Sequence, residues 1–310
     1  MTQRGIWQTV KEIPEILYHY TSVNGLVGIV SDRQIWASHV RYLNDRTEQE
    51  HIWSLILERV QRKILASNDA QAKHNLELFQ DEAKKGVRNE TYVASFSAEG
   101  DLLSQWLSYT PEGIGFAVGF GRRAIEDNCM KQSNIGEPDA MPVAIPGVPV
   151  GIPSAIPCAI MSVFYCSTDE SKPEWALPSL VDGFINVYSG TSPLPSDQMF
   201  KHVQWTTSIV FLLVRWLECL FKDSSFSAER ECRILLSGKP TEVSFRPGKS
   251  MLIPFVKFDL DKTDEYFIKR VVVGPCPNPD LSVLSVKMLF NSVGHPEVEV
   301  LKSSIPYRSW

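Results

Sequence analysis

Three short polar stretches interrupt segments of the chain that are otherwise apolar or strand-like. They are residues 19–22 (HYTS), 95–97 (SFS) and 229–231 (ERE). Polar side chains that point inward from a half-buried strand need hydrogen-bond partners, so such residues mark either an internal network or a site. Taken singly, each stretch is more typical of a network, because a histidine near a strand end is most often a satisfied structural group and Glu-x-Glu is a common tripeptide.

The third stretch carries the strongest candidate for chemistry. Strand alternation over residues 229–236 places Glu229, Glu231 and Arg233 on one face, with apolar residues on the other. An arginine beside a carboxylate holds it ionised and fixes its direction.

The elements that position these residues follow from the hydrophobic periodicity and from turn and cap signals. Strands are predicted at 15–21, 34–38, 91–97, 113–120, 158–166, 229–236, 251–258, 267–274 and 298–303. Helices are predicted at 23–32, from 45 or 47 through Ile64, and at 70–86, 101–109, 198–222 and 281–293. Ser22 is placed to cap the first helix, and residues 304–308 are expected to dock onto the sheet.

One α+β domain over residues 1–310, with an insertion, is the simplest account of this order. Residues 138–157 carry a proline every three or four positions, which excludes a helix and a central strand. We interpret this stretch as an extended surface insertion, and the alternative is a partner-binding arm.

Composition excludes several classes of protein. The net charge of −5 provides no global basic field for nucleic acid. The longest apolar run, 208–221, is shorter than a membrane span and contains Arg215 and Glu218. The first 16 residues lack the pattern of a signal peptide, so no membrane association and a cytoplasmic location are expected. The six cysteines form no CxxC pair and are predicted to be buried free thiols, without a zinc site or a disulfide framework.

The three polar stretches, in this order and on strands, resemble the signature of the ADP-ribosyltransferase-like superfamily. The resemblance implies a twisted, split, mixed or antiparallel sheet flanked by helices, and NAD as the substrate, with no metal. It assigns the adenosine-ribose hydroxyls to His19, a contact near the carboxamide to Thr21 or Ser22, and the nicotinamide ribose to Ser95 or Ser97. The implied NAD-binding set is His19, Tyr20, Thr21, Ser22, Ser95, Phe96, Ser97 and Arg233, with Glu231, His19 and Glu229 as the catalytic residues.

This chemistry is physically coherent. Cleavage of the bond between nicotinamide and ribose develops positive charge on an oxocarbenium-like ring. A fixed carboxylate at Glu231 stabilises that charge more than it stabilises the substrate, and one such contact contributes roughly 2.7–4 kcal/mol. Trp106 and Tyr109 are candidates for a stacking surface, although core packing explains them equally well. Asn44 and Asp45 are either a ligand-facing loop or a turn that bonds its own backbone.

A closer resemblance covers nearly the whole chain. The blocks LYHYTS, IWAS, YLNDRTE, SFSAEGDLLSQWLSY, GIGFAVGF, ERECRIL, VVVGP and KSSIPYR resemble, in order, the mostly prokaryotic domain of unknown function family 2971. The proline-rich stretch departs from that pattern. The resemblance fits a bacterial toxin or phage-defence effector that transfers ADP-ribose to an unknown protein or nucleic-acid acceptor, or to water as an NAD glycohydrolase.

Two other classes of function stay open. A metal-dependent nuclease or hydrolase would use Glu48, Glu229 and Glu231, although Glu48-x-x-His51 is better explained as a solvated helix face. A non-catalytic nucleotide-binding sensor would keep the site without turnover. The segment GIGFAVGFG lacks the GxGxxG spacing and alternates as a strand does, so a Rossmann turn is rejected.

Overall fold

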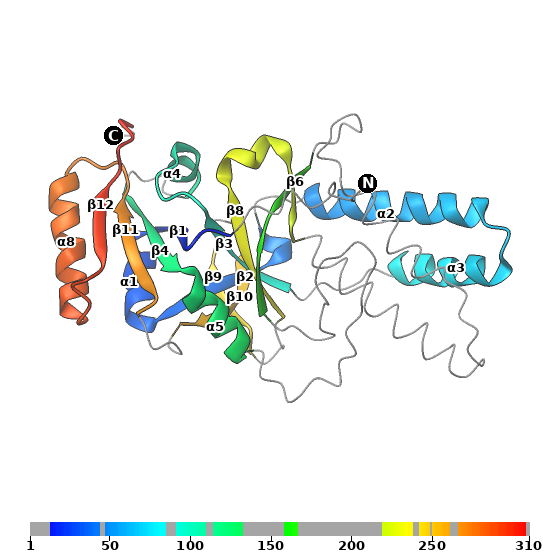
Figure 1. Ribbon diagram of the computed structural model, residues 1–310, viewed down its shortest axis with the longest axis horizontal. Helices are drawn as coiled ribbons and strands as arrows, with labels where there is room; N and C mark the ends of the chain where they lie inside the picture. Colours follow the sequence, from blue (N-terminus) through cyan, green and yellow to red (C-terminus); the bar gives the residue numbers. More distant parts are fainter. Residues whose placement is uncertain are drawn as a thin grey trace, which may run out of the picture.

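A computed structural model shows a mixed α/β protein built on a large, mostly antiparallel sheet, as the α+β prediction requires (Figure 1). It describes residues 13–43, 47–84, 91–109, 114–132, 158–166, 219–237, 242–248, 250–260 and 266–307. The strands are β1 (Ile16–Ser22), β2 (Gln34–His39), β3 (Thr91–Ser97), β4 (Gly115–Gly121), β5 (Cys158–Ser162), β6 (Phe164–Cys166), β7 (Phe221–Asp223), β8 (Glu231–Ser237), β9 (Ser244–Pro247), β10 (Leu252–Asp259), β11 (Ile268–Val273) and β12 (Glu299–Lys302). The helices are α1 (Val23–Asp32), α2 (Thr47–Ala66), α3 (Ala70–Lys84), α4 (Leu103–Tyr109), α5 (Arg122–Gln132) and α8 (Pro279–Ser292), with the 3-10 turns η1 (Val40–Tyr42) and η2 (Ser224–Glu229).

The sheet divides at β3. Its main path runs β12-β11-β4-β1-β3-β2-β10-β9, while β8 pairs with β3 and β5 pairs with β8. Strand β1 meets β3 only at Tyr18 opposite Ser97, whereas β2 meets β3 at Val93 and Tyr92. Strand β8 pairs with β3 over its full length, from Thr91 to Ser97. Between these contacts the edge of β3 that faces β1 and β2 has no strand partner among the described residues, and we call this the split.

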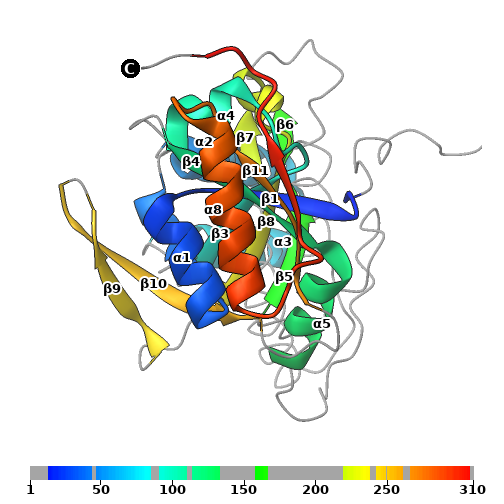
Figure 2. The same cartoon turned by 90° about the vertical axis from the view of Figure 1, so that its left-hand side faces the viewer.

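Helices α1, α5 and α8 cover one face of the sheet, and Figure 2 shows α1 and α8 side by side there. The main core lies between them and the sheet, and its largest members include Leu17, Phe120, Phe258 and Phe290. Ser22 caps α1 as predicted, because its side chain accepts a hydrogen bond from the Gly25 amide. We call the face that α1, α5 and α8 cover the core face.

The opposite face is covered by α4 and by the segment around η2. A small core of Tyr18, Tyr20, Trp106, Ala117 and Val272 packs α4 onto β1 and β4. Helices α2 and α3 pack together and project away from the sheet (Figure 1). None of the helices in the described part of the chain is long and apolar enough to cross a bilayer. We call the face that α4 and the segment around η2 cover the site face.

The beginning of α4 is tied to the end of the described chain. The Asp101 carboxylate accepts hydrogen bonds from Trp106 Nε1 (2.8 Å), Ser303 Oγ (2.6 Å) and the Ser304 amide (2.8 Å). Burial alone raises the pKa of Asp101, but these hydrogen bonds outweigh it and lower the pKa. Ser304 therefore binds the segment that precedes α4, and Ile305 packs against the small core of Tyr18, Tyr20 and Trp106, whereas Arg308 lies outside the described residues.

Three element predictions are wrong in the described residues. Residues 158–166 form two strands that are interrupted at Val163, whose amide donates to the Glu231 carbonyl. Residues 221–223 are the strand β7 rather than the end of a helix, and residues 198–218 lie outside the described residues. Strand β8 begins at Glu231, because Glu229 ends η2 and Arg230 adopts a left-handed conformation (φ 46°). The insertion 138–157 also lies outside the described residues.

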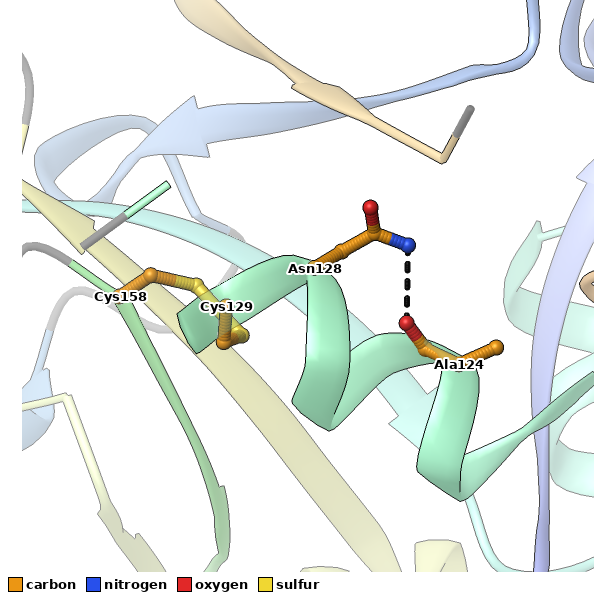
Figure 3. Close-up of a disulfide and its surroundings, with 4 residues drawn as sticks. All are labelled: Ala124, Asn128, Cys129 and Cys158. Carbon is orange, nitrogen blue, oxygen red and sulfur yellow. Dashed lines mark hydrogen bonds between the residues drawn. A yellow bond between two sulfur atoms is a disulfide. The ribbon is translucent and has the colours of Figure 1, made fainter. Parts of the chain in front are cut away.

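The prediction of free thiols is wrong for two cysteines. Cys129 at the end of α5 and Cys158 at the start of β5 form a disulfide (Figure 3), and both are buried. Their positions, 29 residues apart, give no local signal, because the pairing depends on α5 lying beside β5. Cys232 and Cys276 are buried free thiols, as predicted, and Cys219 is buried.

Candidate functional site

The antiparallel pairing of β3 with β8 brings two of the polar stretches together. Ser97 stands opposite Glu231 and Ser95 opposite Arg233. Directly opposed residues share a face, so all four side chains project to the site face. The intervening Phe96 and Cys232 project into the main core.

The Glu231 carboxylate is buried and bonded on both oxygens. Arg233 donates from Nε to Oε1 (2.8 Å) and from Nη2 to Oε2 (3.0 Å), and the Ser95 side chain also bonds to the carboxylate. Burial alone raises the pKa of Glu231, but the charge and hydrogen bonds of Arg233, the charge of Lys222 and the Ser95 bond together lower the pKa to about 2. Glu231 is therefore an oriented anion at neutral pH.

Lys222 joins the two carboxylates of the ERE stretch. Its Nζ lies 2.6 Å from Glu229 Oε2 and 3.2 Å from Glu231 Oε2. Burial alone lowers the pKa of Lys222, but the two carboxylates outweigh burial and raise it. We call Lys222, Glu229, Glu231 and Arg233 the Glu231 cluster. It holds two positive and two negative groups.

Aromatic side chains surround this cluster. The Glu231 amide donates to Tyr165 Oη (2.7 Å), and burial followed by the charges of Glu231 and Glu229 raises the pKa of Tyr165 to about 12. Burial and the same carboxylates raise the pKa of Tyr109. Lys222 Nζ lies 4.8 Å from the ring centre of Phe226. Tyr109 and Phe226 are each 39% exposed, so the rim of the cluster offers aromatic surface to solvent.

Ser97 supports the turn that carries Glu229. Its Oγ donates to the Glu229 carbonyl (2.7 Å) and accepts from the Glu99 amide (3.2 Å). The Ala98 amide donates to the Arg230 carbonyl (2.9 Å), which continues the same connection. Ser97 is only 2% exposed, so in this structure it positions the backbone of the cluster.

His19 occupies the split. Its Nδ1 lies 2.9 Å from the Ser95 carbonyl, which pairs with none of the described strands on that side. Because a carbonyl only accepts, Nδ1 carries the proton and Nε2 is left with a lone pair. Burial and the nearby charge of Arg246 lower the pKa of His19, against the raising effect of its bond to the Ser95 carbonyl. The imidazole is therefore neutral at neutral pH.

Strand alternation places His19 and Glu231 on opposite faces of the sheet. His19 lies between Leu17, which is in the main core, and Thr21, which approaches Gly25 of α1. Ser95 connects the two candidates, because its carbonyl binds the imidazole and its side chain binds the Glu231 carboxylate. The structure thus joins the second and third stretches on the site face, whereas His19 meets them only through the Ser95 backbone, from the opposite face.

Other candidates have structural contacts. Tyr20 Oη donates to the Glu99 carbonyl (2.9 Å) and accepts from the Leu102 amide (3.0 Å). The Trp106 ring is 2% exposed and packs edge-on against Tyr20, so the core-packing interpretation fits it. Ser22 caps α1, and Phe96 lies in the main core beside His19.

Asn44 and Asp45 lie outside the described residues, as do the side chains of Glu48 and His51. Within the part of the chain that the structure describes, no three His, Cys, Asp or Glu side chains gather as metal ligands. Glu229 and Glu231 bind Lys222 and Arg233 instead.

Sequence reasoning missed Lys222, Tyr165 and Phe226. The sequence predicts Lys222 at the end of a helix and Tyr165 near the end of one long strand, so neither is expected beside the ERE stretch. A lysine within ten residues of two carboxylates, Lys222 before Glu229 and Glu231, is the signal that was available.

Comparison of the chain with models of known families, with characterised proteins and with solved structures found no match.

Proposed function

We propose that this chain binds NAD on the site face and cleaves its nicotinamide–ribose bond, with Glu231 as the catalytic carboxylate. The observation that carries the proposal is the state of Glu231: buried, ionised, fixed by Arg233 and Ser95, and edged by half-exposed aromatic rings. A carboxylate that is oriented before the reaction stabilises developing positive charge without reorganisation at that moment. The split of the sheet at β3 supports the ADP-ribosyltransferase-like fold as part of this proposal.

In the proposed reaction the bond between ribose C1′ and the nicotinamide nitrogen breaks, and its electron pair neutralises the pyridinium. The cationic C1′ is stabilised by Glu231, and a nucleophile oxygen then forms the new bond to C1′. Glu229 accepts the proton that this oxygen loses, because its carboxylate lies next to Glu231 through Lys222. The nucleophile is water or a hydroxyl of a macromolecular acceptor. A toxin or defence role for the transfer rests on the sequence resemblance alone.

His19 acts in this proposal through Ser95. Its imidazole binds the carbonyl of the residue whose side chain binds Glu231, so it is a positioning residue. The aromatic rims at Tyr109 and Phe226 provide faces on which a nicotinamide or adenine ring can stack.

A second candidate is a nucleotide-binding module without turnover. The contacts of Glu231 favour it, because both carboxylate oxygens already bind cations and the cluster is electrically balanced. Such a module binds NAD and leaves it intact.

The test measures, by chromatography, the release of nicotinamide from NAD by the purified chain. The reaction is run with and without a cell extract as the source of acceptors. Glu231→Gln is expected to lower the rate by about 10²–10³. Glu77→Gln, the same change at an exposed position on α3, is the matched control and should leave the rate unchanged. EDTA should have no effect.

Equal rates for the natural chain and Glu231→Gln would remove Glu231 from the reaction. Binding of NAD without release under any of these conditions would favour the non-catalytic module. Loss of activity with EDTA would favour the metal-dependent hydrolase.

A further inference from the structure

Arg246 is a cation on the site face, and no carboxylate among the described residues forms an ion pair with it. It lies in β9 opposite Ile253 of β10, and its Nη2 donates to Ser38 Oγ of β2 (3.0 Å). Ser38 stands opposite Val93 of β3, which is on the same face as Ser95, two residues further along the strand. The guanidinium therefore projects to the face that carries Glu231.

The charge of Arg246 has no compensation within the described residues. The side chain is half-buried, and burial lowers its pKa without any acidic group acting against it. Ser38 is its one hydrogen-bond partner among these residues, although a guanidinium carries five N–H donors. Arg230, Arg233 and Arg270, in contrast, each form an ion pair with a glutamate. A desolvated, unpaired cation is costly, so such a group is typical of a site whose anion comes from a ligand.

The position of Arg246 relates it to the split. Its charge lowers the pKa of His19, so the guanidinium acts across the gap in which the imidazole binds the Ser95 carbonyl. From Val93, which is opposite Ser38, to Ser97, which is opposite Glu231, the site face runs along four residues of β3. At the rise of a strand these four residues span about 13 Å. The long side chains of Arg246 and Glu231 reduce the distance between their charged groups.

We propose that Arg246, together with Ser38, binds the diphosphate of the nucleotide whose ribosyl bond Glu231 faces. A guanidinium presents paired N–H groups that match two phosphate oxygens, and a serine hydroxyl next to it adds a neutral donor. The separation along β3 is suited to a ribose that connects a diphosphate at Arg246 with C1′ at Glu231. This inference rests on the proposed function for the identity of the ligand, and on the unpaired guanidinium for the anion site itself.

The experiment is isothermal titration of the full-length chain with ADP-ribose, inorganic pyrophosphate and adenosine. The variants are Arg246→Gln, Arg246→Lys and Glu231→Gln, and Lys257→Gln is the matched control because it removes an exposed positive charge from the adjacent strand β10. Arg246→Gln should weaken ADP-ribose about ten- to a hundredfold, the size of a hydrogen bond to a charged group. The ADP-ribose affinity of Arg246→Lys should lie between those of the natural chain and Arg246→Gln, because a lysine keeps the charge and loses the paired geometry. Adenosine, which lacks phosphate, should bind the natural chain and Arg246→Gln alike.

A purely structural role for Arg246 predicts a different result. Removal of an unpaired half-buried cation should leave the melting temperature of the ligand-free chain unchanged or raised, whereas loss of a structural contact would lower it. A lowered melting temperature with unchanged ADP-ribose affinity would overturn the inference. The inference would also be overturned if Arg246→Gln bound pyrophosphate and ADP-ribose each with the same affinity as the natural chain.

The design separates this inference from the proposed function. Nicotinamide release tests the role of Glu231, and ADP-ribose binding tests the role of Arg246. If ADP-ribose affinity depends on Arg246 while no nicotinamide is ever released, the anion site stands and the proposed reaction fails. If nicotinamide is released at the same rate and KM by Arg246→Gln, the reaction stands and the anion site fails.

Discussion

At Glu231, burial and charge act on the carboxylate in opposite directions. Removing a carboxylate from water is costly, and only a well-bonded partner offsets that cost. Arg233 and Lys222 provide it, and both are themselves buried. Loss of Glu231 therefore leaves two buried cations with Glu229 as their single carboxylate in the cluster.

This arrangement predicts a pH-dependent stability. The pKa of Glu231 falls from 4.5 to about 2 on folding, so the carboxylate stabilises the fold above pH 4.5 and loses that effect as the pH falls toward 2. The change corresponds to about 3 kcal/mol. Glu231→Gln should be less stable than the natural chain at pH 7, and the difference should shrink between pH 4.5 and 2. Urea unfolding at a series of pH values measures it.

Glu77→Gln serves again as the control, because its exposed carboxylate should leave the pH profile unchanged. A constant difference between Glu231→Gln and the natural chain over this pH range would show that ionisation of Glu231 does not stabilise the fold.

Part of the site was predictable at the level of residues. Ser95, Ser97, Glu231 and Arg233 share a face because strands alternate, and alternation is visible in the sequence. The placement of Lys222 and Tyr165 was not predictable. It depends on the interruption between β5 and β6 at Val163 and on the start of β7. The relation of His19 to Glu231 also required the structure, because sequence patterns do not show which faces of two non-adjacent strands coincide.

Among the elements, α1 depends on a close approach to β1. A Cβ built on Gly25 would lie 1.8 Å from Thr21 Oγ1, whereas one on Gly28 of the same helix meets no atom within 4 Å. The two glycines are thus a matched pair within one helix. Gly25 has no room for a side chain, whereas Gly28 does.

Gly25→Ala should destabilise the fold, because the added methyl must displace the stiff Thr21 side chain. Gly28→Ala should stabilise it by about 0.5–1 kcal/mol through the better helix propensity of alanine. Thermal unfolding followed by circular dichroism compares the two. The double change Gly25→Ala with Thr21→Ser, which keeps the hydroxyl, should recover less stability than Gly25→Ala with Thr21→Ala. Equal effects of the two glycine changes would contradict the close packing of α1 on β1.

At the scale of the whole molecule, the disulfide connects α5 to β5 across 29 residues of sequence. A cross-link of this length reduces the entropy of the unfolded chain, with a stabilising effect of roughly 3–4 kcal/mol. Cys129→Ser should lower the melting temperature, and reductant should lower that of the natural chain by a similar amount without affecting the variant. Cys276→Ser, at a buried free thiol, is the control for reductant sensitivity.

Counting thiols in the denatured chain gives an independent check. Reduction should add two titratable thiols, and an unchanged count would show that the two cysteines are not paired.

The general architecture was accessible from the sequence, but its topology was not. The order of strands and helices follows from periodicity, and most predicted elements are found within a few residues of their expected ends. The division of the sheet at β3 arises because β1, β2 and β8 all pair with β3, from which each is far apart along the chain. Such pairings depend on the packing of the whole core.

The bond between Asp101 and Ser304 joins residues 203 positions apart, and β4 pairs on one side with β1 and on the other with β11. During synthesis on a ribosome, α4 and β4 therefore emerge long before their last partners do. The nascent chain must keep the apolar sides of these elements from associating wrongly until β11 and Ser304 have been made. Slow refolding from denaturant, and a benefit from chaperones during expression, follow from that late closure.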